Sequence, residues 1–206
     1  MAQLKSVLGN FSGKMGGKVF YIKDGKTITA NRPEHYNQKS ESVKKNQGKF
    51  GLVNKFTSPV YSEKLIMEIW KKAADVKSER YKNMVSKNSE YFIDNRPTTS
   101  NVITPGGEEN PISEIQYNSG KLNVKLSQQT TGKLIMYVVP INPVSSKSPD
   151  FIVLKTENTE ITDQEFEVTI HPAQVSSINK YKNYIIYAAV VNGNTWTDTF
   201  AVEAKL

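Results

Sequence analysis

The sequence predicts an α+β protein, in which an N-terminal β-hairpin plus short helices precede an immunoglobulin- or fibronectin-like β-sandwich. Residues 18–30 carry a hairpin pattern, and apolar residues then recur at helical spacing as far as residue 88. From residue 112 onward, apolar residues alternate with polar ones in short runs. Short alternating runs of this kind are typical of the strands of a sandwich.

The two ends of the chain also differ in charge. Through residue 100 there are 19 Lys and Arg against 9 Asp and Glu, whereas residues 101–206 carry 8 against 11. Three prolines and a glycine pair lie in the segment between the helical and the strand patterns, as in a connecting segment. We therefore divide the chain into a basic Gly- and Lys-rich hairpin and helical region at 1–95, a linker at 96–111 and a β-sandwich domain at 112–206.

The hairpin is predicted from its strands and its turn. Residues 18–23 (KVFYIK) are β-branched and aromatic, and residues 26–30 (KTITA) resume extended chain. Asp24 and Gly25 between them favour the type I′ turn that joins hairpin strands. The 17 residues before the hairpin are rich in glycine and have too little apolar periodicity to fold alone. We expect this arm to be ordered by contact with the rest of the protein, a neighbouring subunit or a polyanion.

Three helices are expected next. The first covers residues 40–58, although Gly48 and Gly51 each cost a helix about 1 kcal/mol, so packing must hold it. The second begins near Ser62, and the third covers residues 78–88. Their apolar residues, in chain order, are Val43, Phe50, Val53 and Phe56, then Leu65, Ile66, Ile69, Trp70 and Ala73, then Tyr81, Met84 and Val85.

About seven strands are expected after the linker. The first covers residues 112–117, and a hairpin with Asn192 and Gly193 at its turn closes the chain. We expect Tyr184, Tyr187 and Trp196 to pack in the sandwich rather than to form a ligand platform. The other strand signals are Leu122, Val124 and Leu126, the runs KLIMYVV and FIVLK, the alternation Phe166, Val168, Ile170, the run YIIYAAVV, and the shared face of Trp196, Phe200, Val202 and Ala204.

The order of these motifs resembles a family of uncharacterised bacterial proteins common in Bacteroidota. The segments that carry the resemblance are LGNFSGKMGGKVFYIKDGKTITANRP, then QGKFGLVNKFTSP, then WKKA and the terminal hairpin. The chain departs from the family pattern at Ala30 and Asn31, where a second basic residue is usual, and at Lys49, where arginine often stands. The resemblance implies the architecture of a Gly-rich start, a hairpin ending in Arg-Pro, short helices and a C-terminal β-sandwich. It implies no activity for any residue.

Composition excludes several classes of site. The chain has no cysteine and two histidines, so disulfides, thiolate metal sites and a His-rich metal site are excluded. The N-terminus lacks the apolar run of a secretory signal, and no segment has the roughly 20 apolar residues that span a bilayer. We expect a cytoplasmic or virion-associated protein with no membrane span and no signal peptide.

The basic field of the first 60 residues is the strongest functional signal. Lysines neutralise phosphates, and the aromatic residues among them can stack on bases. Lysine far outnumbers arginine there, which argues against base-specific recognition. The competing interpretation is that Phe20 or Tyr21 belongs to a core and that the lysines solubilise a hairpin edge. The candidate polyanion-binding residues are Lys14, Lys18, Lys23, Lys26, Arg32, Lys44 and Lys45.

No catalytic pattern is found. His35 lies in a polar loop, and His171 lies at a strand end, so we expect both at the surface. The pair Glu108 and Glu109 falls in the linker, whereas Glu165 and Glu167 alternate with apolar residues and are expected on the solvent face of a strand.

We therefore predict a non-catalytic structural, assembly or interaction protein, of the kind found in a mobile element or a virion. It has a basic N-terminal arm, a β-sandwich module, no cofactor and no metal. Its partner is expected to be another protein or a second copy. The alternative is a sequence-nonspecific nucleic-acid-binding protein that uses the N-terminal lysines.

Overall fold

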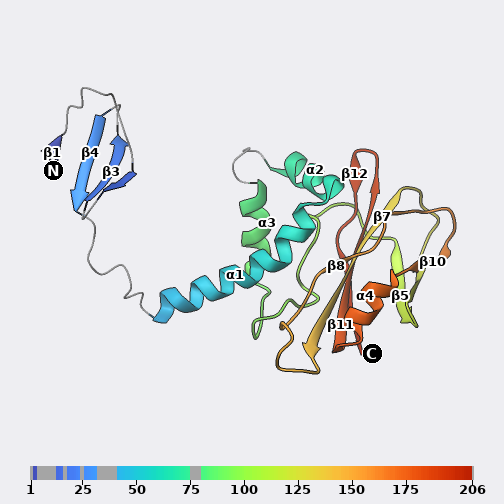
Figure 1. The fold of residues 1–206 in the computed structure, drawn as a ribbon. Helices are drawn as coiled ribbons and strands as arrows, with labels where there is room; N and C mark the ends of the chain where they lie inside the picture. The colour runs from blue at the N-terminus through green and yellow to red at the C-terminus, as the bar shows by residue number, and fades with distance from the viewer. Residues whose placement is uncertain are drawn as a thin grey trace. The chain divides into compact units, whose positions relative to one another are not determined.

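The computed structural model describes residues 2–3, 13–15, 18–23, 26–31, 41–74 and 80–205, which form four helices and three sheets (Figure 1). The predicted α+β class is confirmed. The chain forms two compact units, residues 1–45 and residues 46–206, and each is described here by itself.

The first unit contains a four-stranded antiparallel sheet in the order β1-β4-β3-β2. The predicted hairpin strands are present as β3 and β4, while Asp24 and Gly25 lie outside the described residues. Two pieces of the Gly-rich arm, β1 and β2, pair with the hairpin, so contact with the rest of the chain orders them. The strands are β1 (Ala2–Gln3), β2 (Gly13–Met15), β3 (Lys18–Lys23) and β4 (Lys26–Asn31).

The three predicted helices are present as α1 (Glu41–Tyr61), α2 (Lys64–Ala73) and α3 (Arg80–Ser89). Helix α1 continues through Pro59, where the sequence predicted its end, and Val60 in its last turn is fully buried. Helix α2 buries three of its five predicted core residues, whereas Leu65 is half-buried and Ala73 is exposed.

Nine strands and a fourth helix follow between residues 112 and 205. Each strand signal overlaps a strand, but FIVLK is a strand only at Leu154–Lys155, and Ile170 lies just after β10. The single strand expected from Trp196 to Ala204 is two, β12 and β13, and Trp196 packs in a different core from Phe200, Val202 and Ala204. Helix α4 has no counterpart among the expected elements. Its seven residues begin with Pro172, which fits the first turn of a helix. The elements are β5 (Ile112–Asn118), β6 (Lys121–Leu126), β7 (Lys133–Pro143), β8 (Leu154–Lys155), β9 (Thr159–Glu160), β10 (Glu165–Thr169), α4 (Pro172–Ile178), β11 (Tyr181–Asn192), β12 (Thr195–Trp196) and β13 (Phe200–Lys205).

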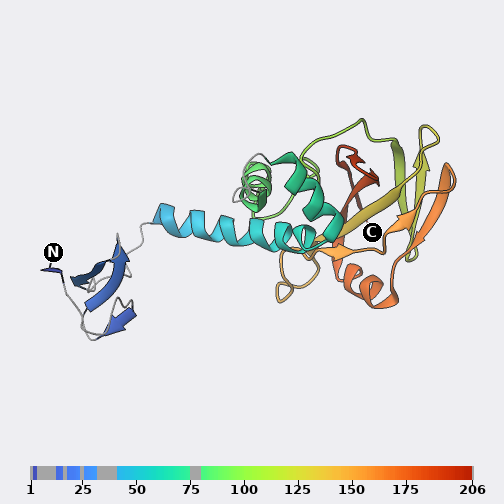
Figure 2. The same ribbon diagram turned by 90° about the horizontal axis from the view of Figure 1, so that it is seen from above.

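These strands form two antiparallel sheets. The smaller has the order β10-β6-β5, and the larger is built on the pair β7 and β11, with β12 and β13 on the outer edge of β11 and β8 and β9 on that of β7. Helices α1, α2 and α3 cover one face of the larger sheet, and the smaller sheet covers the other (Figure 2). The second unit therefore has three layers.

The central strands β7 and β11 are buried on both faces. Tyr137 and Tyr187 point into the core shared with the helices, while Met136 and Ile186 point into the core between the sheets. Burial on both faces explains why these strands read as continuous apolar runs instead of alternating ones. Tyr184 and Tyr187 are core residues, as predicted, and Trp196 is half-buried.

The predicted linker at 96–111 differs from what the structure has, because the chain divides at Lys45 and Asn46 instead. The segment is a strap across the second unit: the Trp70 indole donates to Ile103 O at 3.0 Å, and Thr104 Oγ1 donates to Thr197 O at 3.0 Å. A Cβ at Gly107 would clash with the Trp196 carbonyl oxygen. The prolines and glycines of this segment therefore belong to a connection that packs closely on the second unit, not to a flexible linker.

Candidate interaction surfaces

The pairing register of the first unit sorts its lysines onto the two faces of the sheet. Lys14 is opposite Val19, and Lys23 is opposite Lys26, whereas Lys18 is opposite Met15 and Asn31. Because residues alternate between faces along a strand, Lys14, Lys23 and Lys26 share one face, and Lys18 lies on the other. We call the face that carries Lys14, Lys23 and Lys26, together with Tyr21, the lysine face.

Each face of the sheet exposes a large apolar side chain: Tyr21 on the lysine face and Ile22, which is 48% exposed, on the opposite face. Tyr21 is 39% exposed, while Val19 and Ile28 beside it are half-buried. On the opposite face Phe20 and Thr27 are buried. The interpretation of Phe20 as a core residue is therefore confirmed, and Tyr21 remains available at the surface.

The remaining predicted polyanion-binding residues are not gathered on this sheet. Lys44 and Lys45 lie in the first turns of α1, and Arg32 lies outside the described residues, as does His35. The structure thus brings together Lys14, Lys23 and Lys26 from the predicted set.

A second candidate surface is the exposed segment of α1, residues 46–51. All six residues are exposed, and the Phe50 side chain is 58% exposed. The sequence grouped Phe50 with Val53 and Phe56, which are both fully buried. At about 100° per residue, Phe50 is turned about 120° around the helix axis from Phe56. Phe50 is turned only about 60° from Val53, however, and six consecutive residues cover every side of a helix. The exposure of residues 46–51 therefore reflects their position along α1, before the turns that pack in the second unit, and the spacing of the apolar residues gave no sign of it.

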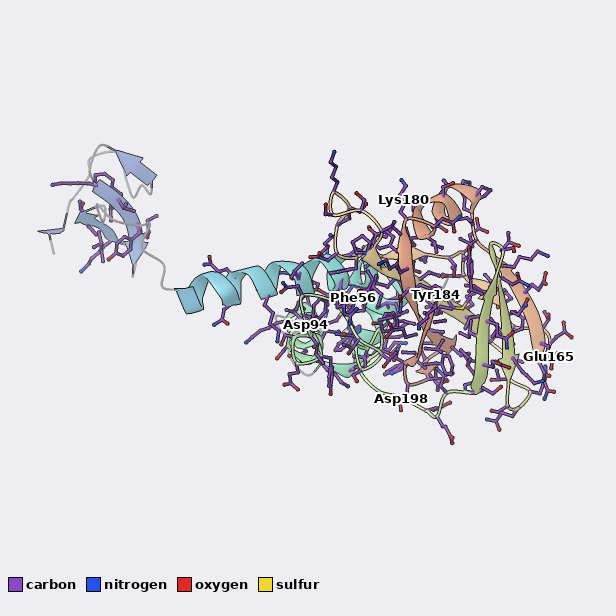
Figure 3. The ribbon with its side chains drawn as sticks, turned by 90° about the horizontal axis from the view of Figure 1, so that it is seen from below. Phe56, Asp94, Glu165, Lys180, Tyr184 and Asp198 are labelled. Carbon is purple, nitrogen blue, oxygen red and sulfur yellow. The ribbon has the colours of Figure 1, made fainter. Side chains whose placement is uncertain are left out.

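The outer face of the smaller sheet is polar and forms a shallow depression of about 350 Å³. Both of its lysines are paired, Lys121 with Glu167 and Lys125 with Glu165, each at 2.6 Å. Glu114 accepts a hydrogen bond from Gln116 Nε2 at 2.6 Å. Glu165 and Glu167 lie on the solvent face as predicted, and Figure 3 shows Glu165 on the side of the unit away from Phe56. Exposed pairs like these contribute roughly 0–1 kcal/mol each, so this surface carries no preorganised site.

The described histidine and carboxylate side chains form no further candidate site. His171 is exposed, as predicted, and its Nδ1 accepts a hydrogen bond from Ala173 N at 3.2 Å, which caps helix α4. Within the part of the chain that the structure describes, no three His, Asp or Glu side chains are grouped to hold a metal ion. None of the described helices is both long and apolar enough to cross a bilayer.

One partly buried ion pair joins the helices to the larger sheet. The Glu63 carboxylate, between α1 and α2, accepts hydrogen bonds from Lys155 of β8 and, at 3.2 Å, from Asn158 Nδ2. Burial acts to raise the pKa of Glu63, but these two hydrogen bonds and the Lys155 charge outweigh it and lower the pKa. The carboxylate therefore stays ionised and fixes the helical layer to the sheet edge.

Two buried tyrosines make the stability of the second unit depend on pH in the alkaline range. Burial, with a smaller effect of the Glu63 charge, raises the pKa of Tyr137, and burial likewise raises the pKa of Tyr187. A raised pKa in the folded state means that the neutral form stabilises the fold below the ordinary pKa of about 10 and that this stability is lost as pH rises above it. The loss approaches about 1.4 kcal/mol per pH unit for each tyrosine.

We expect Tyr137→Phe to reduce this loss between pH 10 and 12. The phenylalanine keeps the ring and gives up one hydrogen bond, from the hydroxyl to Val60 O at 3.4 Å. Urea unfolding at a series of pH values measures the effect, and Tyr91→Phe, which removes an exposed hydroxyl, is the matched control. An unchanged slope in Tyr137→Phe would contradict the assignment.

No family model, no curated protein and no solved structure matches the chain. The resemblance to the Bacteroidota family accordingly stays a prediction from the sequence motifs.

Proposed function

We propose that this chain is a non-catalytic structural or assembly protein that associates with a second copy through the exposed segment of α1. The observation that carries the proposal is Phe50, a large apolar side chain that is more than half exposed on a helix whose next turns are buried. Because a single exposed apolar side chain is normal on a protein surface, Phe50 supports the proposal together with the full exposure of residues 46–51 around it.

The two glycines of the segment offer a second contact side on the same helix. Nothing lies within 4 Å of a Cβ built at Gly48 or Gly51, so packing within the second unit gives no reason for either glycine. Each costs the helix about 1 kcal/mol relative to alanine. Close approach of a second helix would supply a reason, because glycine lets two backbones come near each other. Gly48 and Gly51 lie about 160° and 100° around the helix axis from Phe50, so such a helix would contact another side of α1 than Phe50 does.

We expect Phe50→Ser to weaken this self-association. Size-exclusion chromatography with light scattering, over a wide range of protein concentration, measures the mass of the particle. The matched control is Val144→Ser, which removes a 66% exposed apolar side chain elsewhere in the second unit. A chain that stays monomeric at every concentration, or a Phe50→Ser variant that associates like the control, would refute the proposal.

We infer that the two sheets of the second unit form an immunoglobulin- or fibronectin-like sandwich. Strands β5, β6 and β10 share one sheet, and β7, β11 and β13 share the other. In chain order these correspond to strands A, B and E against C, F and G, the division found in immunoglobulin-like sandwiches.

The lysine face supports a second candidate function, sequence-nonspecific nucleic-acid binding. Lys14, Lys23 and Lys26 lie on one sheet face beside an exposed aromatic ring. Salt separates the two candidates, because neutralised phosphates release counterions and make the affinity fall steeply with ionic strength. Association through Phe50 depends on apolar contact and lacks this steep dependence.

A further inference from the structure

We propose that the lysine face binds single-stranded nucleic acid, with an unpaired base stacked on Tyr21 and its neighbouring phosphates held by Lys14, Lys23 and Lys26. The inference rests on the second candidate function and names its substrate class and the residues that would select it.

The register places Tyr21 between the lysines. Along β3, Lys23 is two residues from Tyr21 on the same face, a separation of roughly 6.6 Å. Lys26 is opposite Lys23 on β4, and Lys14 is opposite Val19, which is two residues from Tyr21 in the other direction. A base stacked on the Tyr21 ring would therefore have cationic residues on both sides of it along the strand.

The charge of the sheet favours an anionic partner. Its four strands contain four lysines and no Asp or Glu. Lys23 and Lys26 are directly opposed across the hairpin, and like charges at such a position destabilise a sheet. A phosphate bound between them would remove that repulsion, so the arrangement fits an anion better than water.

The exposed aromatic ring selects a single strand over a duplex. Stacking on a side chain requires an unpaired base, since the bases of a duplex already stack on one another. Tyr21 is 39% exposed, with the half-buried Val19 and Ile28 beside it, so the centre of the face is apolar and its margins are cationic. The set contains lysine rather than arginine, which suits phosphate contacts without base-specific recognition.

Fluorescence anisotropy of the full chain with a labelled single-stranded DNA of mixed sequence tests the proposal. We expect single-stranded DNA to bind more tightly than the same sequence as a duplex at equal salt. Tyr21→Ala should weaken binding by about 5-fold to 150-fold, which corresponds to the loss of one stacked base, whereas Tyr21→Phe should keep it. Lys23→Ala combined with Lys26→Ala should reduce the salt slope by about 1.4, for two phosphates of a single strand.

The control for charge is Lys180→Ala combined with Lys182→Ala, two exposed lysines of the second unit, which should leave affinity and slope unchanged. Far-UV circular dichroism checks that each variant is folded, and the preference of the unmodified chain for single strand over duplex needs no variant. No binding of either DNA at low salt would overturn the second candidate function and this inference together. Equal binding of both, with Tyr21→Ala neutral, would leave nucleic-acid binding standing and overturn the inference alone.

Discussion

A fragment of residues 46–206 is expected to fold with nearly the stability of the full chain, whereas a fragment of residues 112–206 is expected not to fold cooperatively. The shorter fragment keeps both sheets but loses helices α1, α2 and α3. The face of β7 and β11 that these helices cover would then meet water. Its fully buried large side chains are Ile135, Tyr137, Val139, Ile141, Ile185 and Tyr187.

The size of the effect follows from the burial of these side chains. Each large apolar side chain contributes about 1.5–3 kcal/mol when it is fully buried, so exposing six of them costs about 10 kcal/mol or more. A whole domain is stable by only about 5–15 kcal/mol. The helical layer is therefore needed for the fold of the sheets.

Urea unfolding and binding of a hydrophobic dye to the two purified fragments measure the difference. The fragment 46–206 is the matched control, because it also lacks the first unit but keeps the helical layer. A cooperative transition of 112–206 at the same urea concentration as the control would contradict the three-layer account and restore a domain boundary near residue 100.

The sequence predicted the helices and strands better than their division into domains. The hairpin, the three helices and the strand signals depend on local spacing and turn chemistry, which a single sequence displays. The domain boundary depends on long-range packing between the helices, the strap and the larger sheet. Nothing in the sequence around Thr104 indicates that its hydroxyl donates a hydrogen bond to Thr197 O. The continuous run KLIMYVV did carry a sign of burial on both faces, because a strand with one solvated face alternates.

The candidate surfaces were predictable to a similar degree. The count of lysines marked the first unit as basic, but only the strand register separates Lys14, Lys23 and Lys26 from Lys18. That register depends on the pairing of β2 with β3, and the glycine-rich arm gives no sequence pattern from which to predict it. Asn88 was likewise missed, because a polar residue on a helix is ordinarily assigned to the solvent side.

Asn88→Ala is expected to lower the free energy of unfolding by about 3 kcal/mol or more. Asn88 is fully buried in α3 and fastens the 96–111 strap to the helix. Its Nδ2 donates to Met84 O and Val102 O, both at 3.0 Å, and its Oδ1 accepts from Val102 N at 2.9 Å and from Asn101 Nδ2 at 3.0 Å. Alanine removes all four bonds and leaves the part-buried backbone N–H and C=O of Val102 without the Asn88 side chain, and a buried group that loses its partner costs about 1–3 kcal/mol.

Urea unfolding compares Asn88→Ala with Asn83→Ala, which removes an exposed asparagine from the same helix and should change the stability by no more than about 0.5 kcal/mol. Asn101→Ala should also destabilise, and the double variant should lose less than the sum of the two, because the side chains share a hydrogen bond. Additive losses would contradict a shared network. If Asn88→Ala matched its control, the strap would be held through its other contacts, such as the Trp70 hydrogen bond to Ile103 O and the Thr104 hydrogen bond to Thr197 O.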